Sequence, residues 1–235
     1  MKERPIIFSA PMVRAILAGK KMQTRRAVKP FGKDGGFVIL ETDRRVWPYR
    51  SDDGESTSHT VKRGGKLYLD ESPHSCPYGQ PGDRLWVRET FSGPHCMDAS
   101  NGCKAVPPSE WGRSSRIWYW ADGVPTNGDW TRPRPSIHMP RWASRILVEI
   151  TAVRVEQLQD ISDADIEAEG AAQWVKDGGS VRSPHPGFDG QWPDAAGTVR
   201  VKPNRVVFCS LWESINGPQS WDANPWVWVI EFKKV

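Results

Sequence analysis

The chain has 235 residues, of which 38% are hydrophobic and 26% are charged; this composition is typical of a globular protein and excludes a disordered or fibrous one. Its 32 basic residues exceed its 28 acidic residues by only four, far less than a protein that coats nucleic acid needs. No apolar run approaches the roughly 18 residues that cross a membrane, and the chain start does not resemble a signal peptide. We therefore expect a cytoplasmic protein without membrane contact.

The first predicted elements are a short strand at 4–10 (RPIIFSA) and an amphipathic helix at 11–18 (PMVRAILA). Pro11 suits a first helical turn, and Gly19 suits a helix C-terminus. We expect the residues that follow, GKKMQTRR, to leave the helix and enter an extended segment.

The middle of the chain alternates between loop-rich insertions and short strands. Residues 31–75 form the first predicted insertion, with one possible hairpin at 37–49 (FVILETDRRVWPY). A turn and a strand follow at 82–89 (GDRLWVRE). A second insertion covers 92–140 and is interrupted by the strand-like segment 116–123 (RIWYWADG).

Regular patterns return in the last third of the chain. The alternating run 143–159 predicts one bent strand or two paired strands. A helix is expected within 161–175 (ISDADIEAEGAAQWV), beginning near Asp163, with Ser162 as the N-cap and acidic residues in the first turn. A third loop-rich insertion covers 176–204.

The chain ends with a predicted short helix at 206–215 and a strand at 225–235. The total is roughly five to seven strands with about three helices interspersed singly, which favours an α+β fold, a small β-barrel with packed helices, over a doubly wound sheet. We expect a single domain over 1–235. The sequence contains no dinucleotide-binding, P-loop or nucleophile-elbow motif.

Thirteen tryptophans are the most unusual feature of the composition. Two pairs occupy alternate positions, Trp118 with Trp120 and Trp226 with Trp228, and such spacing is typical of rings that fill one face of a sheet. The alternative is that one or two rings stack on a planar ligand such as a nucleobase.

A cluster of metal-ligand residue types also occurs, made of His74, Cys76, His95, Cys96 and Cys103. It contains no C-x-x-C pair, and its intervals match no zinc template. We therefore expect reduced, structural cysteines and no metal.

Four separated blocks of the chain resemble, in order, the ASCH domain family. They are VRAILAGKKMQTRR at 13–26, GDRLWVRE at 82–89, VEITAVRVEQLQDISDADIEAEG at 148–170 and WVIEFKKV at 228–235. In that family a glycine-lysine motif follows the first helix and a GD turn starts a barrel strand. The resemblance covers about half of the chain and implies a β-barrel related to the PUA fold, with a cleft for RNA or modified nucleotides.

Within this family, a small bacterial group hydrolyses N4-acetylcytidine to cytidine and acetate with a lysine, a threonine and a glutamate. The resemblance places these residues on Lys21, Thr24 and Glu169, and Arg26 completes the motif. It implies a metal-independent amidohydrolase that needs no cofactor and acts on a small nucleoside, an N4-acylcytidine. The segments GDRLWVRE and PSIHMPRWASR also resemble proteins carried by bacteriophages, which suggests nucleotide metabolism.

The implied chemistry assigns a role to each residue. The Thr24 hydroxyl would be the nucleophile and the Lys21 amine its base, which requires burial or the charges of Arg25 and Arg26 to lower a lysine pKa of about 10.4. Because a carboxylate beside Lys21 would raise that pKa, we expect Glu169 instead to hold the exocyclic amide and assist protonation of the leaving amine. Arg26 would bind the substrate oxygen or oxyanion.

Side chains three residues apart on an extended strand point to opposite faces, so Lys21 and Thr24 can meet only if a turn or bulge after Gly19 breaks the alternation. Glu89, at the end of RLWVRE, is a second substrate-binding candidate, with an ion pair at the barrel edge as the alternative. His138 is expected to be a loop histidine.

Other functions remain open at this point. A module that binds RNA or a modified nucleotide could use the same cleft, and a ribonuclease is also compatible with the family. The lysine, threonine and glutamate together favour the hydrolase, because a binding module would not need them. Arg25 departs from the family pattern, since an apolar residue would suit a buried strand better. The acyl group, the choice between nucleoside and RNA, and the oligomeric state are not specified by the sequence.

Overall fold

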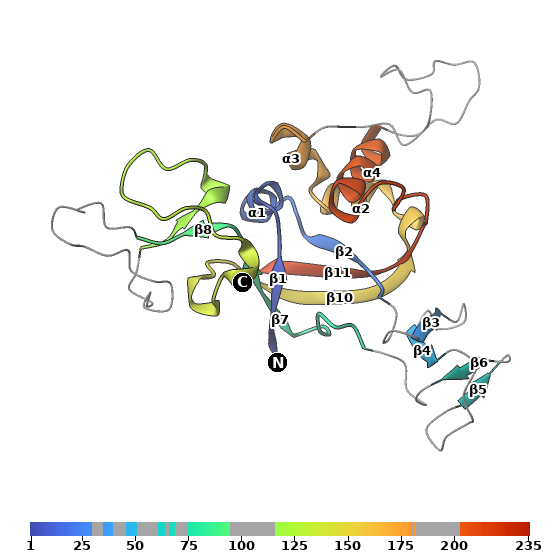
Figure 1. Ribbon diagram of the computed structural model, residues 1–235. Coiled ribbons are helices and arrows are strands. Elements are labelled where there is room, and N and C mark those ends of the chain that lie inside the picture. The colour runs from blue at the N-terminus through green and yellow to red at the C-terminus, as the bar shows by residue number, and fades with distance from the viewer. Residues whose placement is uncertain are drawn as a thin grey trace, which may run out of the picture.

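The protein was analysed as a computed structural model, which describes residues 1–29, 75–94, 116–179, 181 and 203–235 and the backbone of four strand segments at 35–39, 46–50, 61–63 and 66–68. These parts form an α+β fold, as the sequence predicted, with a five-stranded main sheet and helices that gather on one side of it (Figure 1). None of the described helices combines the length and apolar character needed to cross a bilayer.

The main sheet brings together strands from both ends of the chain. Its order is β1 (Glu3–Ile7), β7 (Arg84–Arg88), β10 (Leu147–Gln157), β11 (Trp226–Lys234) and β2 (Gln23–Ala27). β1 and β7 are parallel, and the other neighbours are antiparallel. The alternating run at 143–159 is thus one strand rather than two, with a register irregularity between Ile150 and Ala152.

β1 and β2 are the two end strands of this sheet. The guanidinium of Arg26 on β2 donates a hydrogen bond of 2.6 Å to the carbonyl of Ile7 on β1, so a side chain connects the ends. The described strands show no backbone pairing between β1 and β2, and the barrel stays a prediction.

Four α-helices are described, and they refine the sequence-based boundaries. They are α1 (Ala10–Leu17), α2 (Asp163–Ala168), α3 (Ala171–Lys176) and α4 (Pro203–Asn216). Ser162 caps α2 and exchanges two hydrogen bonds with Asp165 in a capping box, which confirms the predicted N-cap. The prediction of one helix over 161–175 is wrong, because Gly170 adopts a left-handed φ of 74° and separates α2 from α3.

The insertion at 31–75 contains a second sheet. Its order is β3 (Gly35–Ile39), β4 (Val46–Arg50), β6 (Lys66–Tyr68) and β5 (Val61–Arg63). The antiparallel pairing of β3 with β4 confirms the predicted hairpin. Residues 95–115 of the second predicted insertion and 182–202 of the third lie outside the described part of the chain.

Shorter elements surround the main sheet. They are a two-stranded sheet of β8 (Phe91–Ser92) and β9 (Trp118–Tyr119), and the 3-10 helices η3 (Trp120–Asp122), η4 (Ser136–His138), η5 (Arg141–Ala143) and η6 (Leu158–Asp160). The expected strand alternation of Trp118 and Trp120 is wrong, because the chain turns into η3 at Trp120. The described residues contain eleven strands, more than predicted, since segments that resemble loops pair over two or three residues.

The hydrophobic core fixes the site-bearing elements to one another. Its buried residues come from β1, α1, β7, β10, α4 and β11 and include Ile6, Val13, Leu85, Val148, Phe208 and Ile230. Each buried aliphatic or aromatic side chain of this kind stabilises the fold by about 1.5–3 kcal/mol. A smaller cluster of Phe91, Met139 and Ala143 lies beneath the 116–145 region.

Candidate active site

The turn after α1 places Lys21 ahead of its strand. Gly19 has a left-handed φ of 69°, and the N–H groups of Lys20 and Lys21 donate to the carbonyl of Ala15 at 2.8 and 3.1 Å. β2 begins only at Gln23. Strand alternation therefore does not apply to Lys21, and the predicted turn after Gly19 is present.

Glu169 comes from the other side of the fold, as the C-cap of α2. Gly170 directly after it makes the approach to α1 possible. A Cβ atom at position 170 would lie 3.0 Å from the Cβ of Ala15 and 3.1 Å from the Cβ of Lys21, on a left-handed backbone. The Glu-Gly dipeptide thus has a structural reason: glycine supplies both the turn and the space that bring Glu169 to Lys21.

Lys21 and Glu169 form a buried contact. The Lys21 Nζ donates to the Glu169 carbonyl at 2.7 Å and to its Oε2 at 2.9 Å, and the two residues are 3% and 4% exposed. Burial is the main cause that lowers the pKa of Lys21; Glu169 opposes this effect, and Arg26 and Arg25 add to it. A lowered lysine pKa is what the sequence-based mechanism requires.

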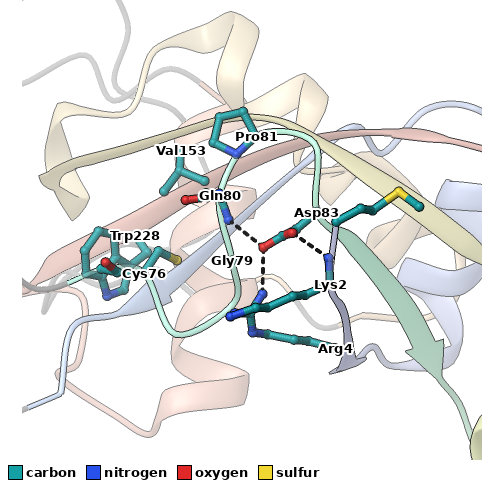
Figure 2. A pocket seen from close by; sticks show the side chains of 11 residues that line it. Lys2, Arg4, Cys76, Gly79, Gln80, Pro81, Asp83, Val153 and Trp228 are labelled. Carbon is teal, nitrogen blue, oxygen red and sulfur yellow. Dashed lines mark hydrogen bonds and ion pairs between the residues drawn. The ribbon is translucent and has the colours of Figure 1, made fainter.

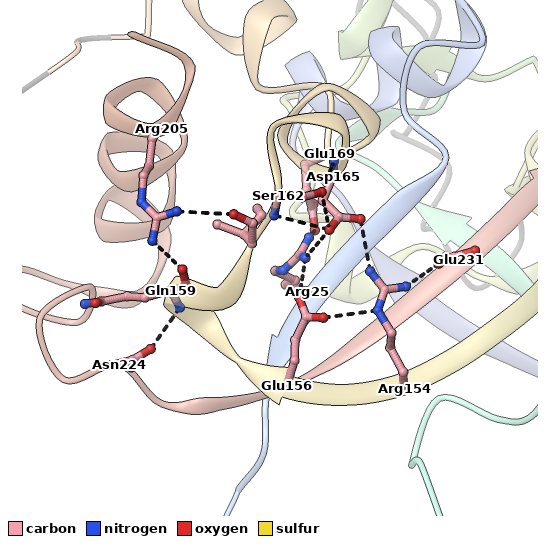
Figure 3. A network of polar contacts seen from close by, with 11 residues as sticks. Arg25, Arg154, Glu156, Gln159, Ser162, Asp165, Glu169, Arg205, Asn224 and Glu231 are labelled. Atoms are coloured by element: carbon pink, nitrogen blue, oxygen red, sulfur yellow. Dashed lines mark hydrogen bonds and ion pairs between the residues drawn. The ribbon is translucent and has the colours of Figure 1, made fainter. Parts of the chain in front are cut away.

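Arg25 binds the second oxygen of the same carboxylate. Its Nη1 lies 3.2 Å from Glu169 Oε1, and its Nη2 pairs with Glu156 Oε1 and lies 3.3 Å from Asp165 Oδ2. Figure 3 shows this guanidinium between Glu156 on β10 and the two acidic residues of the α2 region. Three carboxylates thus surround Arg25, whose charge was unexpected in a buried strand.

The network continues toward the surface. Arg154 pairs with Glu156 at 3.1 Å, with Asp165 at 3.0 Å and with Glu231 (Figure 3). Burial raises the pKa of Asp165, but hydrogen bonds from Ser162 and the charge of Arg25 outweigh burial and bring it to about 2. This network was not predicted from the sequence. Its only signal was the charged residues at alternate positions of β10, a strand otherwise rich in aliphatic residues.

Thr24 is buried, with 4% exposure, and lies opposite Ile230 in the register of β2 and β11. Because neighbours on a strand point to opposite faces, it shares a face with Arg26 and not with Arg25. No hydrogen bond among the described residues joins the Thr24 hydroxyl to Lys21 or Glu169. The structure therefore brings Lys21 and Glu169 into contact, while Thr24 is buried on β2 without a hydrogen bond to either of them among the described residues.

Arg26 lies between two aromatic rings. Its guanidinium carbon is 5.4 Å from the centre of the Phe8 ring and 6.0 Å from that of Tyr78. The Lys21 Nζ is 5.5 Å from the centre of the same Phe8 ring, so both cations lie near Phe8. The Nε of Arg26 is buried and has no hydrogen-bond partner among the described residues.

Glu89 belongs to a separate cluster. Both of its oxygens accept hydrogen bonds of 3.0 Å from Arg145, which also binds Asp122 and lies 4.0 Å from the Tyr119 ring centre. Glu89 is 1% exposed, and burial raises its pKa. This geometry fits the ion-pair alternative, and Glu89 shares no described partner with Lys21. His138 is exposed at the end of η4, as expected for a loop histidine.

A cavity of about 450 Å³ lies beside the turn before β7 (Figure 2). Its lining includes Arg4, Gln80, Asp83, Val153 and Trp228, but not the Lys21–Glu169 contact. The Asp83 carboxylate accepts hydrogen bonds from the backbone N–H of Lys2 and from Arg4, which bring its pKa to about 2. Asp83 therefore stays charged and closes a structural turn.

Two cysteines are described, Cys76 and Cys209, and both are buried free thiols. Burial raises the pKa of each, that of Cys209 to about 12, so neither resembles a reactive thiolate. The other candidate zinc ligands, His74, His95 and Cys96 with Cys103, lie outside the described residues. Among described residues, no group of three or more His, Cys, Asp and Glu side chains is arranged to hold a metal ion.

Comparison with known proteins gave no match: no family model, no curated protein and no solved structure matches this chain.

Proposed function

We propose that this protein is a cytoplasmic, ASCH-type amidohydrolase with a PUA-like barrel, which converts an N4-acylcytidine into cytidine and a carboxylic acid without a metal or cofactor. The observation that carries the proposal is the buried contact of Lys21 with Glu169, 148 residues apart in sequence. Solvent-exposed lysines need no such partner. A lysine amine enclosed by a fold, with its pKa lowered by burial, is suited to proton transfer.

The hydrogen bonds of Lys21 also orient the amine when it is neutral. A neutral amine has two N–H groups and one lone pair, whereas an ammonium has three N–H groups. The carbonyl and the Oε2 of Glu169 accept two hydrogen bonds from Nζ. Neutral Lys21 can therefore donate both of its protons to Glu169 and leave its lone pair free to accept another.

The proposed reaction uses this lone pair twice. Lys21 takes the Thr24 hydroxyl proton as the oxygen attacks the acyl carbon, and Arg26 stabilises the negative oxygen of the tetrahedral intermediate. The C–N bond then breaks, the leaving N4 takes the proton back from Lys21, and the acyl group remains on Thr24 as an ester. Lys21 then takes a proton from water as its oxygen attacks the ester, and the Thr24 oxygen takes that proton back from Lys21 as the carboxylic acid is released.

The geometry leads us to revise the role of Glu169. Its two oxygens already accept hydrogen bonds from Lys21 and Arg25, and its carbonyl binds Lys21 as well. We therefore assign it to orienting the base rather than to holding the exocyclic amide of the substrate.

The direct test is incubation of the purified protein with N4-acetylcytidine and chromatographic detection of cytidine. Wild type and Thr24→Ser should produce cytidine, and Thr24→Ala should not, because serine keeps a hydroxyl at this position. A chelator should have no effect. Turnover that survives Thr24→Ala, or that the chelator abolishes, contradicts the mechanism. Absence of turnover on any acylcytidine, together with tight RNA binding, would indicate the binding module instead.

A further inference from the structure

Arg25 is the most deeply buried charge of the described network. Its side chain has 0% exposure, and among the described residues it forms ion pairs with the carboxylates of Glu156, Asp165 and Glu169. Removing a guanidinium from water costs several kcal/mol even when it is paired. An apolar residue would avoid this cost, so its presence on β2 calls for a reason beyond packing.

The contacts of Arg25 reach both ends of one short helix. Asp165 lies in the first turn of α2, and Glu169 is its C-cap. A helix of six residues has almost no stability of its own, so its position depends on what holds it. Arg25 joins both ends of α2 to β2, the strand that follows Lys21.

The same contacts fix the rotation of the Glu169 carboxylate. Arg25 Nη1 binds Oε1, and Lys21 Nζ binds Oε2. With Oε1 held by an arginine that cannot lose its proton, Oε2 and the backbone carbonyl of the same residue are both directed at the lysine amine.

We propose that Arg25 is a positioning residue, which holds Glu169 so that its carboxylate and carbonyl together orient the Lys21 amine as a base. The proposal rests on the proposed function in assigning Lys21 that role. In this arrangement Arg25 acts through its contact with Glu169.

Arg25 also influences the charge balance at Lys21. The charged groups acting on the amine are Glu169 from the α2 region and Arg26 and Arg25 from β2. Glu169 raises the pKa of Lys21, and the two arginines lower it. Loss of Arg25 removes a positive charge that lowers the pKa of Lys21. It also removes one of the two cations that pair with Glu169, so the carboxylate raises the pKa of Lys21 more strongly.

The test compares Arg25→Met with Arg154→Met. Methionine replaces either arginine with a neutral side chain, but only Arg25 contacts Glu169; Arg154 binds the other members of the network. The Lys21 side chain is titrated by NMR on protein with carbon-13-labelled lysine, with Lys21→Met for assignment. This readout does not require turnover.

Arg25→Met should raise the pKa of Lys21 by about one unit or more. It should also shift the rise of kcat/KM on N4-acetylcytidine with pH to higher pH by the same amount, which lowers the rate about tenfold at pH values below the pKa of Lys21. Arg154→Met should leave the titration of Lys21 unchanged. An unchanged titration in folded Arg25→Met, or an equal shift in both variants, overturns the positioning role.

Arg25→Met leaves Glu156 with a buried, less compensated charge. If this variant does not fold, the double variant Arg25→Met/Glu156→Gln removes that charge and allows the same comparison. If wild type has no hydrolase activity, the proposed function fails, while the titration still decides whether Arg25 controls the protonation of Lys21. If activity is present and the titration does not move, only the role of Arg25 fails.

Discussion

Glu169 and Glu89 are both buried carboxylates paired with basic side chains, but their partners differ in chemistry. Both oxygens of Glu89 bind one arginine, Arg145, whose pKa is lowered by burial but raised more strongly by its hydrogen bonds to Asp122 and Glu89. The oxygens of Glu169 are divided between Arg25 and Lys21. Only a lysine among these cations can release its proton near neutral pH.

The two clusters differ as a structural ion pair differs from a site suited to proton transfer. The Glu89 cluster connects β7 to the 116–145 region through a cation that stays charged, so its expected contribution is to stability. The Glu169 cluster places a carboxylate next to an amine whose pKa burial has lowered. Burial and pairing are common to both, and the identity of the cation decides which chemistry is available.

The largest expected effect is on catalysis, from Lys21→Met. Loss of the base should lower kcat/KM on N4-acetylcytidine by about 10²–10⁴-fold, whereas Lys20→Met, at the exposed neighbouring lysine, should leave it within about twofold. Steady-state kinetics on both variants measure this difference. Equal loss in both would show that the buried amine has no special role.

Next in size is the loss of stability from Arg145→Met. Removing the partner of a buried carboxylate should reduce the free energy of unfolding by about 3 kcal/mol, because Glu89 would be left without its two hydrogen bonds. The matched variant is Arg141→Met, whose pair with Glu3 is exposed, with an expected loss under about 1 kcal/mol. Urea unfolding of each variant measures the two losses of stability. A shift in the pH profile of hydrolysis caused by Arg145→Met would contradict the separation of the two clusters.

A smaller effect is expected from Gly170→Ala. Both this residue and Gly178 have left-handed φ values, 74° and 86°, but a Cβ would meet Ala15 and Lys21 only at position 170. Gly178→Ala should cost about 1 kcal/mol for the backbone alone. Gly170→Ala should cost about 1–3 kcal/mol more through crowding. Thermal unfolding of the two variants measures the difference, and equal costs would show that the close approach of α2 to Lys21 is not tight.

The smallest expected effect concerns the caps of two helices. Ser162→Ala should destabilise the protein by about 1 kcal/mol, because the Ser162 side chain accepts a hydrogen bond from the N–H of Asp165. Ser9 is the N-cap of α1 but makes no side-chain capping bond, so Ser9→Ala should be nearly neutral. Denaturant unfolding measures the loss of stability in each variant. An equal loss for Ser9→Ala and Ser162→Ala would contradict the capping role of Ser162.

Local signals in the sequence predicted the fold class and several boundaries. Pro11 and Gly19 delimit α1, Ser162 begins α2, and the alternation at 225–235 gives β11, because each depends on residues close in sequence. The short strands β5 and β6 were missed for the opposite reason: three-residue strands carry too little periodicity to be recognised. The split between α2 and α3 was also missed, although Gly170 marked it.

The main residues of the candidate site could be predicted from the sequence, but the contacts between them could not. The resemblance supplied Lys21, Thr24 and Glu169, and the turn after Gly19 followed from strand geometry. The direct Lys21–Glu169 contact and the burial of Arg25 depend on how α2 lies against β2, which long-range packing determines. Glu89 was assigned to substrate binding with an ion pair as the alternative, and only the position of Arg145 favours the ion pair.

The order of strands has a consequence for the newly synthesised chain. β2 pairs with β11, which lies some two hundred residues later, at positions 226–234, so the strand that follows Lys21 remains unpaired until the ribosome has released the last of these residues. The main sheet is therefore complete only after residues 226–234 have left the ribosome, and the buried setting of Lys21 forms after that segment has been synthesised.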